Sequence, residues 1–136
     1  MAQFVFTNPK VTINTVDLSD HVKRVVLNYG ADMLDDTVAG DTTRSRIGGL
    51  LDWSIEVEFI QDFAAAKVDA TLFTLVGATT ALTVQPVNAA ISATNPEFQG
   101  TGCLESYGPM GNAIGELAST RAVFQSAGTL VRDITP

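Results

Sequence analysis

The sequence of 136 residues contains only one cysteine, one histidine and one tryptophan. Because Cys103 is alone, no disulfide can form within the chain, and a metal or redox site built from paired cysteines is excluded. His21 has no second histidine with which to bind zinc or to share acid–base chemistry. These shortages predict a chain that uses neither a metal nor another cofactor.

Long apolar runs are missing as well. Residues 70–96 carry no charge, but threonine, glutamine, proline and asparagine interrupt them. A membrane-spanning helix needs about 20 mostly apolar residues. The first ten residues have neither the basic start nor the long apolar centre of a signal peptide. We therefore expect no contact with a membrane.

Basic residues are few, with 8 against 15 acidic residues and a net charge of −7. They are scattered along the chain, whereas nucleic-acid binders cluster lysine and arginine to neutralise phosphates. Tight DNA or RNA binding is therefore not expected, although a surface that DNA slides past is compatible with this charge. Hydrophobic residues make up 46% of the chain. This share is high for a small monomer and indicates that part of the surface is buried against other subunits.

The clearest pattern in the chain is the alternation over residues 50–60, which predicts a strand with one buried face. The helical spacing of apolar residues over 62–76 predicts a helix that begins at Asp62 and ends before Gly77. The predicted core face consists of Trp53, Ile55, Val57 and Phe59 from the strand, and of Val68 and Leu72 from the helix. On the opposite face of the strand lie Asp52, Glu56 and Glu58.

Other segments add shorter strands. Residues 10–29 read as two strands around a polar turn at 17–20, and further strands are expected within 81–87, 98–107 and 115–128. The Gly- and Pro-containing stretch 108–115 predicts a hairpin loop. Together these elements predict a single mainly β domain over 1–136, a β-sandwich or partly closed barrel with one flanking α-helix.

A polar arm at about residues 34–49 separates two of these strands. It carries charges of both signs on Asp35, Asp36, Asp41, Arg44 and Arg46, followed by Ile47. An ordinary flexible hairpin loop would account for it. However, loops longer than about 12–15 residues are uncommon in compact domains unless they are functional or disordered. Opposite charges on one loop also suit head-to-tail contact between copies of the same chain.

No arrangement of residues predicts an enzyme. Glu56 and Glu58 lie about 6.5–7 Å apart along a strand, a spacing that glycosidases use for paired carboxylates. However, these enzymes usually place the two groups on different elements, and a solvated acidic face is the simpler interpretation. The chain has no G-x-S-x-G nucleophile turn and no phosphate-binding G-K-[ST] loop. We therefore assign no catalytic and no metal-binding residue.

The order of these segments resembles the major tail tube proteins of long-tailed, siphophage-type bacteriophages. The resemblance rests on a strand pair, the arm "MLDDTVAGDTTRSRIGGL", the strand "DWSIEVEF", the segment "QDFAAAKVDATLFTLVG" and a final strand "STRAVFQSAG". It implies a β-sandwich or barrel with one helix, and subunits that form hexameric rings stacked into a hollow tube. It also implies that the arm reaches a neighbouring ring and that Asp52, Glu56 and Glu58 are candidates for an acidic lumen wall.

The same resemblance implies a place in the virion tail for a protein made in the host bacterial cytoplasm. Its partners would be copies of itself and other tail proteins, namely the tape measure, the tail terminator and the baseplate or tip. DNA would pass through the lumen without specific binding. Two alternatives remain open from the sequence: a tail terminator or connector, which forms one ring and stops, and a small monomeric ligand-binding β-sandwich.

Overall fold

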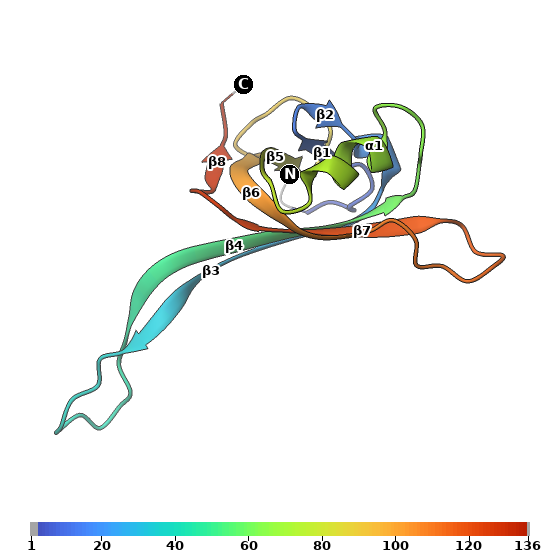
Figure 1. Ribbon diagram of the computed structural model, residues 1–136. Coiled ribbons are helices and arrows are strands. Elements are labelled where there is room, and N and C mark those ends of the chain that lie inside the picture. The colour runs from blue at the N-terminus through green and yellow to red at the C-terminus, as the bar shows by residue number, and fades with distance from the viewer. Residues whose placement is uncertain (1–2, 136) are drawn as a thin grey trace.

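The computed structural model describes residues 3–135, which form an eight-stranded antiparallel sheet, one short helix and their connections (Figure 1). The helix α1 covers Val68–Leu72, and 3-10 turns cover Ser19–His21 and Phe73–Leu75. The strands are β1 (Lys10–Ile13), β2 (Val16–Asp17), β3 (Val22–Asp35), β4 (Arg46–Ile60), β5 (Thr79–Gln85), β6 (Glu97–Gly108), β7 (Ser119–Ser126) and β8 (Val131–Asp133).

The sheet bends around its own core. Its strands follow the order β2-β1-β5-β6-β7-β4-β3, and β8 pairs with the start of β6. Strand β6 belongs to both halves, because residues 98–103 pair with β5 and residues 102–108 pair with β7. A register shift between Leu104 and Ser106 marks an irregularity within the second half of this strand. The end strands β2 and β3 do not pair with each other, so the sheet is not closed, and the predicted mainly β fold with one helix is confirmed.

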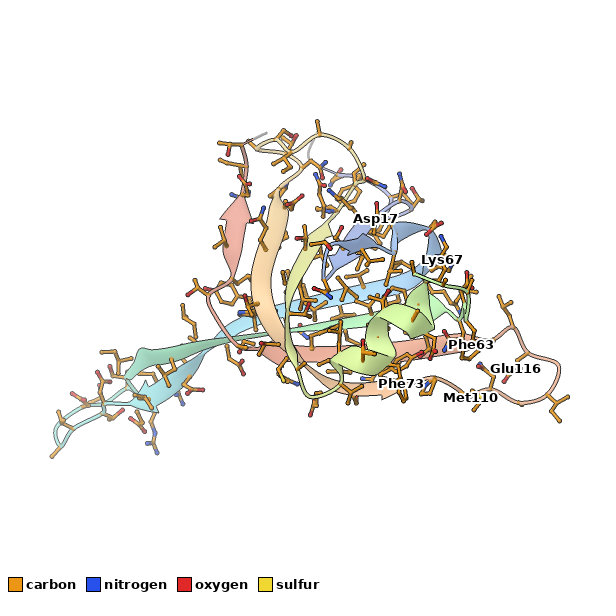
Figure 2. All side chains as sticks on the ribbon, turned by 45° about the horizontal axis from the view of Figure 1, so that its top comes forward. Asp17, Phe63, Lys67, Phe73, Met110 and Glu116 are labelled. Carbon is orange, nitrogen blue, oxygen red and sulfur yellow. The ribbon has the colours of Figure 1, made fainter. Side chains whose placement is uncertain are left out.

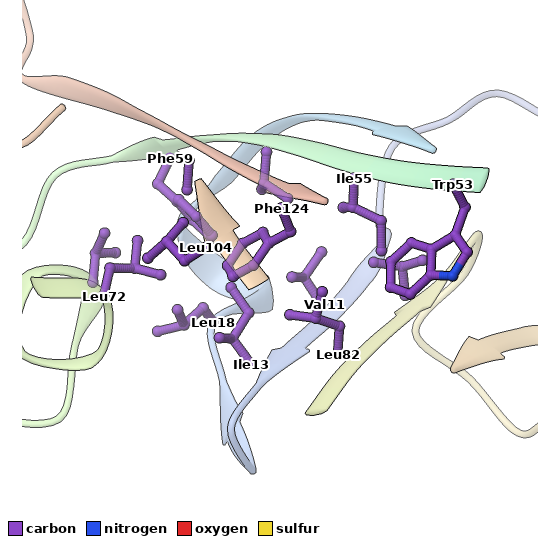
Figure 3. Close-up of a cluster of buried hydrophobic side chains, with 14 residues drawn as sticks. Val11, Ile13, Leu18, Trp53, Ile55, Phe59, Leu72, Leu82, Leu104 and Phe124 are labelled. Atoms are coloured by element: carbon purple, nitrogen blue, oxygen red, sulfur yellow. The ribbon is translucent and has the colours of Figure 1, made fainter. Parts of the chain in front are cut away.

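The core lies between the two halves of the sheet and α1 (Figure 3). The inward residues of β4 alternate strictly with outward ones, since successive side chains of a strand point to opposite faces. All six side chains that the sequence assigns to the core are at most 3% exposed: Trp53, Ile55, Val57, Phe59, Val68 and Leu72. Each buried side chain of this size stabilises the fold by roughly 1.5–3 kcal/mol.

Two glycines allow β6 to pack closely against its neighbours, and one of them, Gly100, lies against Trp53. A Cβ atom added to Gly100 would lie 2.7 Å from Trp53 Cζ2, and one added to Gly102 would lie 2.6 Å from Leu82 Cδ1. The indole Nε1–H of Trp53 also donates a hydrogen bond of 2.8 Å to the carbonyl oxygen of Gly128. The ring therefore contacts β6 and is hydrogen-bonded to the link between β7 and β8.

The helix is shorter than the sequence predicts. α1 begins at Val68, and the residues from 62 to 67 are non-helical. Asp62 does not cap it, because its carboxylate accepts the backbone N–H of Ala64 at 2.9 Å. Ala66 has a φ of +59°, a left-handed conformation that a right-handed helix cannot contain. At the other end Gly77, with φ of +79°, follows the 3-10 turn where the sequence places a terminating glycine.

The two strands expected within residues 10–29 do not pair with each other. β1 pairs with β2 and β5, whereas β3 pairs with β4. The polar turn is present, since Asp17 Oδ1 accepts the N–H of Ser19 at 2.9 Å. However, Leu18 within the turn is fully buried. This burial anchors the turn in the core, and the chain then enters β3 at the opposite end of the strand order.

The contact between Trp53 and β6 gives a first prediction. We expect Gly100→Ala to destabilise the protein by about 1–3 kcal/mol, because the new methyl group overlaps a ring that cannot move away. The control is Gly108→Ala on the same strand, where a Cβ meets no atom within 4 Å. Denaturant unfolding monitored by tryptophan fluorescence measures both variants. Equal stability of the two variants would contradict the role given to Trp53.

Candidate assembly surfaces

The longest feature of the molecule is the β3–β4 hairpin, which leaves the body and extends to the lower left of Figure 1. We call residues 29–35 and 46–52 its stem and residues 36–45 its tip. The predicted arm at about 34–49 therefore consists of the tip and the outer part of the stem. Strand pairing continues to Asp35 and Arg46, so the arm is less of a loop than the sequence indicates.

Most charged side chains of the tip make ion pairs or hydrogen bonds within the hairpin. Arg44 Nη1 lies 2.8 Å from Asp35 Oδ2, and Asp41 Oδ2 accepts the N–H of Val38 at 2.9 Å. Hydrogen bonds from Thr37, with a smaller contribution from Arg44, hold the pKa of Asp35 below its usual value. Asp36 and Arg46 make no ion pair with any residue from 3 to 135. Within the described chain, these two charges remain available for another molecule.

The stem is apolar, which the sequence analysis missed. Six of its large side chains are between 55% and 81% exposed: Tyr29, Met33, Leu34, Ile47, Leu50 and Leu51. They occupy both faces, because Leu34 pairs with Ile47 on one face while Met33 lies opposite Gly48 on the other. The signal was present in the sequence as "ML" and "IGGLL" on either side of the tip. It was hidden because neither run alternates.

The outer face of the sheet carries the acidic residues predicted for β4. Glu56 Oε1 lies 2.6 Å from Arg121 Nε on β7 and 3.9 Å from Arg24 Nη1 on β3. Asp52 Oδ1 accepts a hydrogen bond of 2.7 Å from Ser126. The hydrogen bond from Arg121 keeps the pKa of Glu56 low. This favours a permanent carboxylate over the raised pKa that a glycosidase acid requires.

A second apolar surface lies at the opposite end of the molecule from the hairpin (Figure 2). Figure 2 shows Phe63 and Phe73 at the same end as the β6–β7 loop, residues 109–118. Both phenylalanines and the large apolar side chains of this loop are more than half exposed. We call this the far-end patch: Phe63, Phe73, Met110, Ile114 and Leu117. Gln61 ties the loop to the segment before α1, because its Nε2–H donates to the carbonyl of Pro109 at 2.8 Å.

The single histidine holds the same end together. Nδ1 of His21 lies 2.8 Å from Asp20 Oδ1, and Nε2 lies 2.9 Å from Asp62 Oδ2. His21 thus bridges the turn before β3 and the segment that carries Phe63. The hydrogen bond to Asp62, reinforced by Asp20, raises the pKa of His21. The same contacts contribute to lowered pKa values of Asp20 and Asp62.

Residues 3–135 give no indication of a metal site or of a membrane-spanning helix. These residues contain no group of three or more histidine, cysteine, aspartate or glutamate side chains placed to hold a metal ion. None of the helical segments in this part of the chain is long and apolar enough to cross a membrane.

Solved structures of tube assemblies have the same fold. A chain in the tail of an empty gene transfer agent particle, refined with C6 symmetry, matches with a TM-score of 0.70 and 17% identity over 92% of this chain and 93% of that chain. The SPP1 tail tube matches with a TM-score of 0.70 and 11% identity over 93% and 76% of the chains.

A third match is Hcp1 from Flavobacterium johnsoniae, with a TM-score of 0.53 and 16% identity over 93% of this chain and all of that chain. No protein-family model and no curated protein matched the sequence. The chain therefore has the tail-tube fold, and the resemblance predicted from the sequence is confirmed at the level of the fold.

The His21 bridge predicts a pH dependence of stability. A histidine whose pKa is raised by folding stabilises the fold fully below its unfolded pKa of about 6.5, and this contribution is lost as the pH rises through the folded pKa. The two aspartates contribute above their unfolded pKa and lose this contribution as the pH falls. We expect His21→Gln to cost about 1–2 kcal/mol near pH 5.5 and little near pH 9.

Denaturant unfolding of both proteins across this pH range measures the difference. Arg44→Gln is the control, since it breaks an exposed ion pair that contains no group titrating in this range. A His21→Gln effect of equal size at both pH values would show that His21 contributes packing and not charge.

Proposed function

We propose that this chain is a structural subunit of a phage tail, which assembles into hexameric rings that stack into a hollow tube for the passage of DNA. The observation that carries this proposal is the shared fold, which extends over more than nine-tenths of the chain in both tail assemblies. One of these tails has C6 symmetry in its printed description. The subunit would belong to the virion, with other tail proteins as its partners.

The open sheet supports assembly into a ring. Strand β3 has 14 residues and pairs with β4 on one side only within the described chain. A long unpaired edge exposes a row of N–H and C=O groups, which soluble proteins usually cover. In a closed ring, the neighbouring subunit covers this edge and leaves no free strand.

The hairpin supports stacking of rings. Its apolar side chains are exposed in a single copy, and Asp36 of the tip and Arg46 of the stem make no ion pair in residues 3–135. An element that projects from one end of a subunit makes a heterologous contact, which repeats without limit along an axis. In this proposal Asp35, Asp41 and Arg44 shape the tip, while Asp36, Arg46 and Ile47 contact the neighbour.

The outer face of the sheet is proposed as the lumen wall. Asp52, Glu56 and Glu58 of β4 share this face with Glu105, which accepts a hydrogen bond of 2.8 Å from Gln125. Arg24 and Arg121 offset only part of this charge. A wall with more carboxylates than guanidinium groups repels phosphates, so that DNA moves along it without binding.

Electron microscopy tests the proposed assembly. We expect hollow tubes or stacked rings from the concentrated protein. A variant in which residues 34–47 are replaced by Asn-Gly should lose stacking, because the hairpin then closes with a short turn between the paired residues Met33 and Gly48 and lacks Asp36, Arg46 and Ile47. Thr94→Ala in the β5–β6 loop is the control and should form tubes. Single rings that never stack would favour a tail terminator or connector, and monomers under all conditions would contradict the proposal.

The charge of the lumen wall can be tested with DNA. Tubes assembled with labelled double-stranded DNA should leave it sensitive to nuclease, because the acidic wall does not retain it. Tubes of the double variant Asp52→Lys/Glu58→Lys should protect DNA at low salt and release it as the salt concentration rises.

The matched control for this charge reversal is Asp52→Asn/Glu58→Gln, which removes the negative charges without adding positive ones. We expect it to protect much less DNA than the lysine variant. If the lysine variant forms tubes that protect no DNA, these residues do not line the lumen.

A further inference from the structure

The stem and the far-end patch cannot contact each other within one copy. The stem projects from one end, whereas the far-end patch lies at the other end, and both views show them on opposite sides of the body (Figures 1 and 2). Each surface contains side chains that are more than half exposed, including Leu50 at 81% and Met110 at 82%. Such contiguous apolar surfaces usually mark sites of protein contact.

We infer that the far-end patch is the receiving surface for the stem of a second copy of this chain. This inference rests on the proposed function, since it assigns the partner surface of the stacking contact. It goes further by naming the residues on both sides: Met33, Leu34, Ile47, Leu50 and Leu51 on the stem, and Phe63, Phe73, Met110, Ile114 and Leu117 on the patch.

Contact between two stems would cover less apolar surface than contact between a stem and a patch. If two stems paired with each other about a two-fold axis, the contact would be isologous and would close after two copies. The far-end patch of both copies would then remain in water. Contact between stem and patch covers both surfaces at every junction, and it leaves an uncovered stem or patch only at the two ends of the assembly.

Hydrogen bonds hold the segments of the far-end patch together. Gln61 Nε2–H donates to the hydroxyl oxygen of Tyr107 at 2.9 Å and to the carbonyl of Pro109, and Tyr107 donates to Asp69 of α1 at 2.8 Å. These bonds join the end of β6, the loop 109–118 and the helix that precedes Phe73. A surface that is already held in place loses less conformational entropy when a partner binds.

One pair of opposite charges, each without an ion-pair partner in the described chain, fits this contact. Arg46 stands at the outer end of the stem and has no acidic partner in residues 3–135. Glu116 lies on the loop of the patch, where its carboxylate accepts the N–H of Ala113 at 2.7 Å but meets no lysine or arginine in the described chain. A contact between Arg46 of one copy and Glu116 of the next, at the rim of the apolar surfaces, would favour this orientation of the two copies.

Crosslinking between single-cysteine variants tests the inference. Both variants carry Cys103→Ser, so that the only thiol is the introduced one. Leu50→Cys places a thiol on the stem and Ile114→Cys places one on the patch, where the side chain is fully exposed. The two proteins carry tags of different size, are mixed at the concentration used for microscopy, and are treated with a flexible bismaleimide, which does not require disulfide geometry.

We expect a crosslinked species that contains one copy of each variant. The control replaces Ile114→Cys by Thr94→Cys, which is exposed in the β5–β6 loop at the top of Figure 1, and this crosslink should be absent. Crosslinking of Leu50→Cys only with itself would overturn the inference in favour of stem-to-stem contact.

The combination with microscopy separates the two proposals. Tubes without the stem-to-patch crosslink would overturn this inference and leave the proposed function standing. The crosslink without tubes would support head-to-tail contact but contradict the tube. Absence of both would overturn both.

Discussion

The structure depends on the point at which β4 leaves the body, and Trp53 marks that point. From Trp53 to Phe59 every second side chain of β4 is buried, and from Leu51 back to Arg46 none is. The indole ring packs closely against Gly100 of β6 and is hydrogen-bonded to the backbone at Gly128. The hairpin is therefore a two-stranded ribbon held at one end only, and Trp53 packs at the point where it leaves the body.

A two-stranded ribbon without a second layer is only marginally stable in water. In this chain it is also apolar on both faces, so water is a poor environment for its side chains. The polar contacts of the tip, such as the pair Asp35–Arg44, define the turn but give the stem no cover. The body of the protein buries its own core, whereas the large apolar side chains of the stem remain exposed in a single copy. This division between a self-sufficient body and a dependent extension is what an assembling subunit needs.

The sequence allowed the body to be predicted more accurately than the surfaces. Strict alternation in β4 identified its core face because one side of that strand is buried and the other is solvated. Alternation cannot identify the stem, because both of its faces are apolar, and the charged tip indicates a polar segment. The helix was overextended because apolar spacing cannot reveal the left-handed backbone at Ala66. Strand pairing across the barrel also depends on Leu18, whose burial is a tertiary effect.

The register of the hairpin restricts how such a protein can change during evolution. A strand advances about 3.3–3.4 Å per residue, and a shift by one residue turns each side chain to the other face. A stem that gained one residue pair would therefore present Leu34 and Ile47 to the wrong side, whereas two added pairs would restore the original faces. Without a further bulge, a change in reach that keeps each side chain on its face therefore comes in steps of roughly 7 Å. In the proposed tube, such a change would alter the spacing between subunits by discrete amounts.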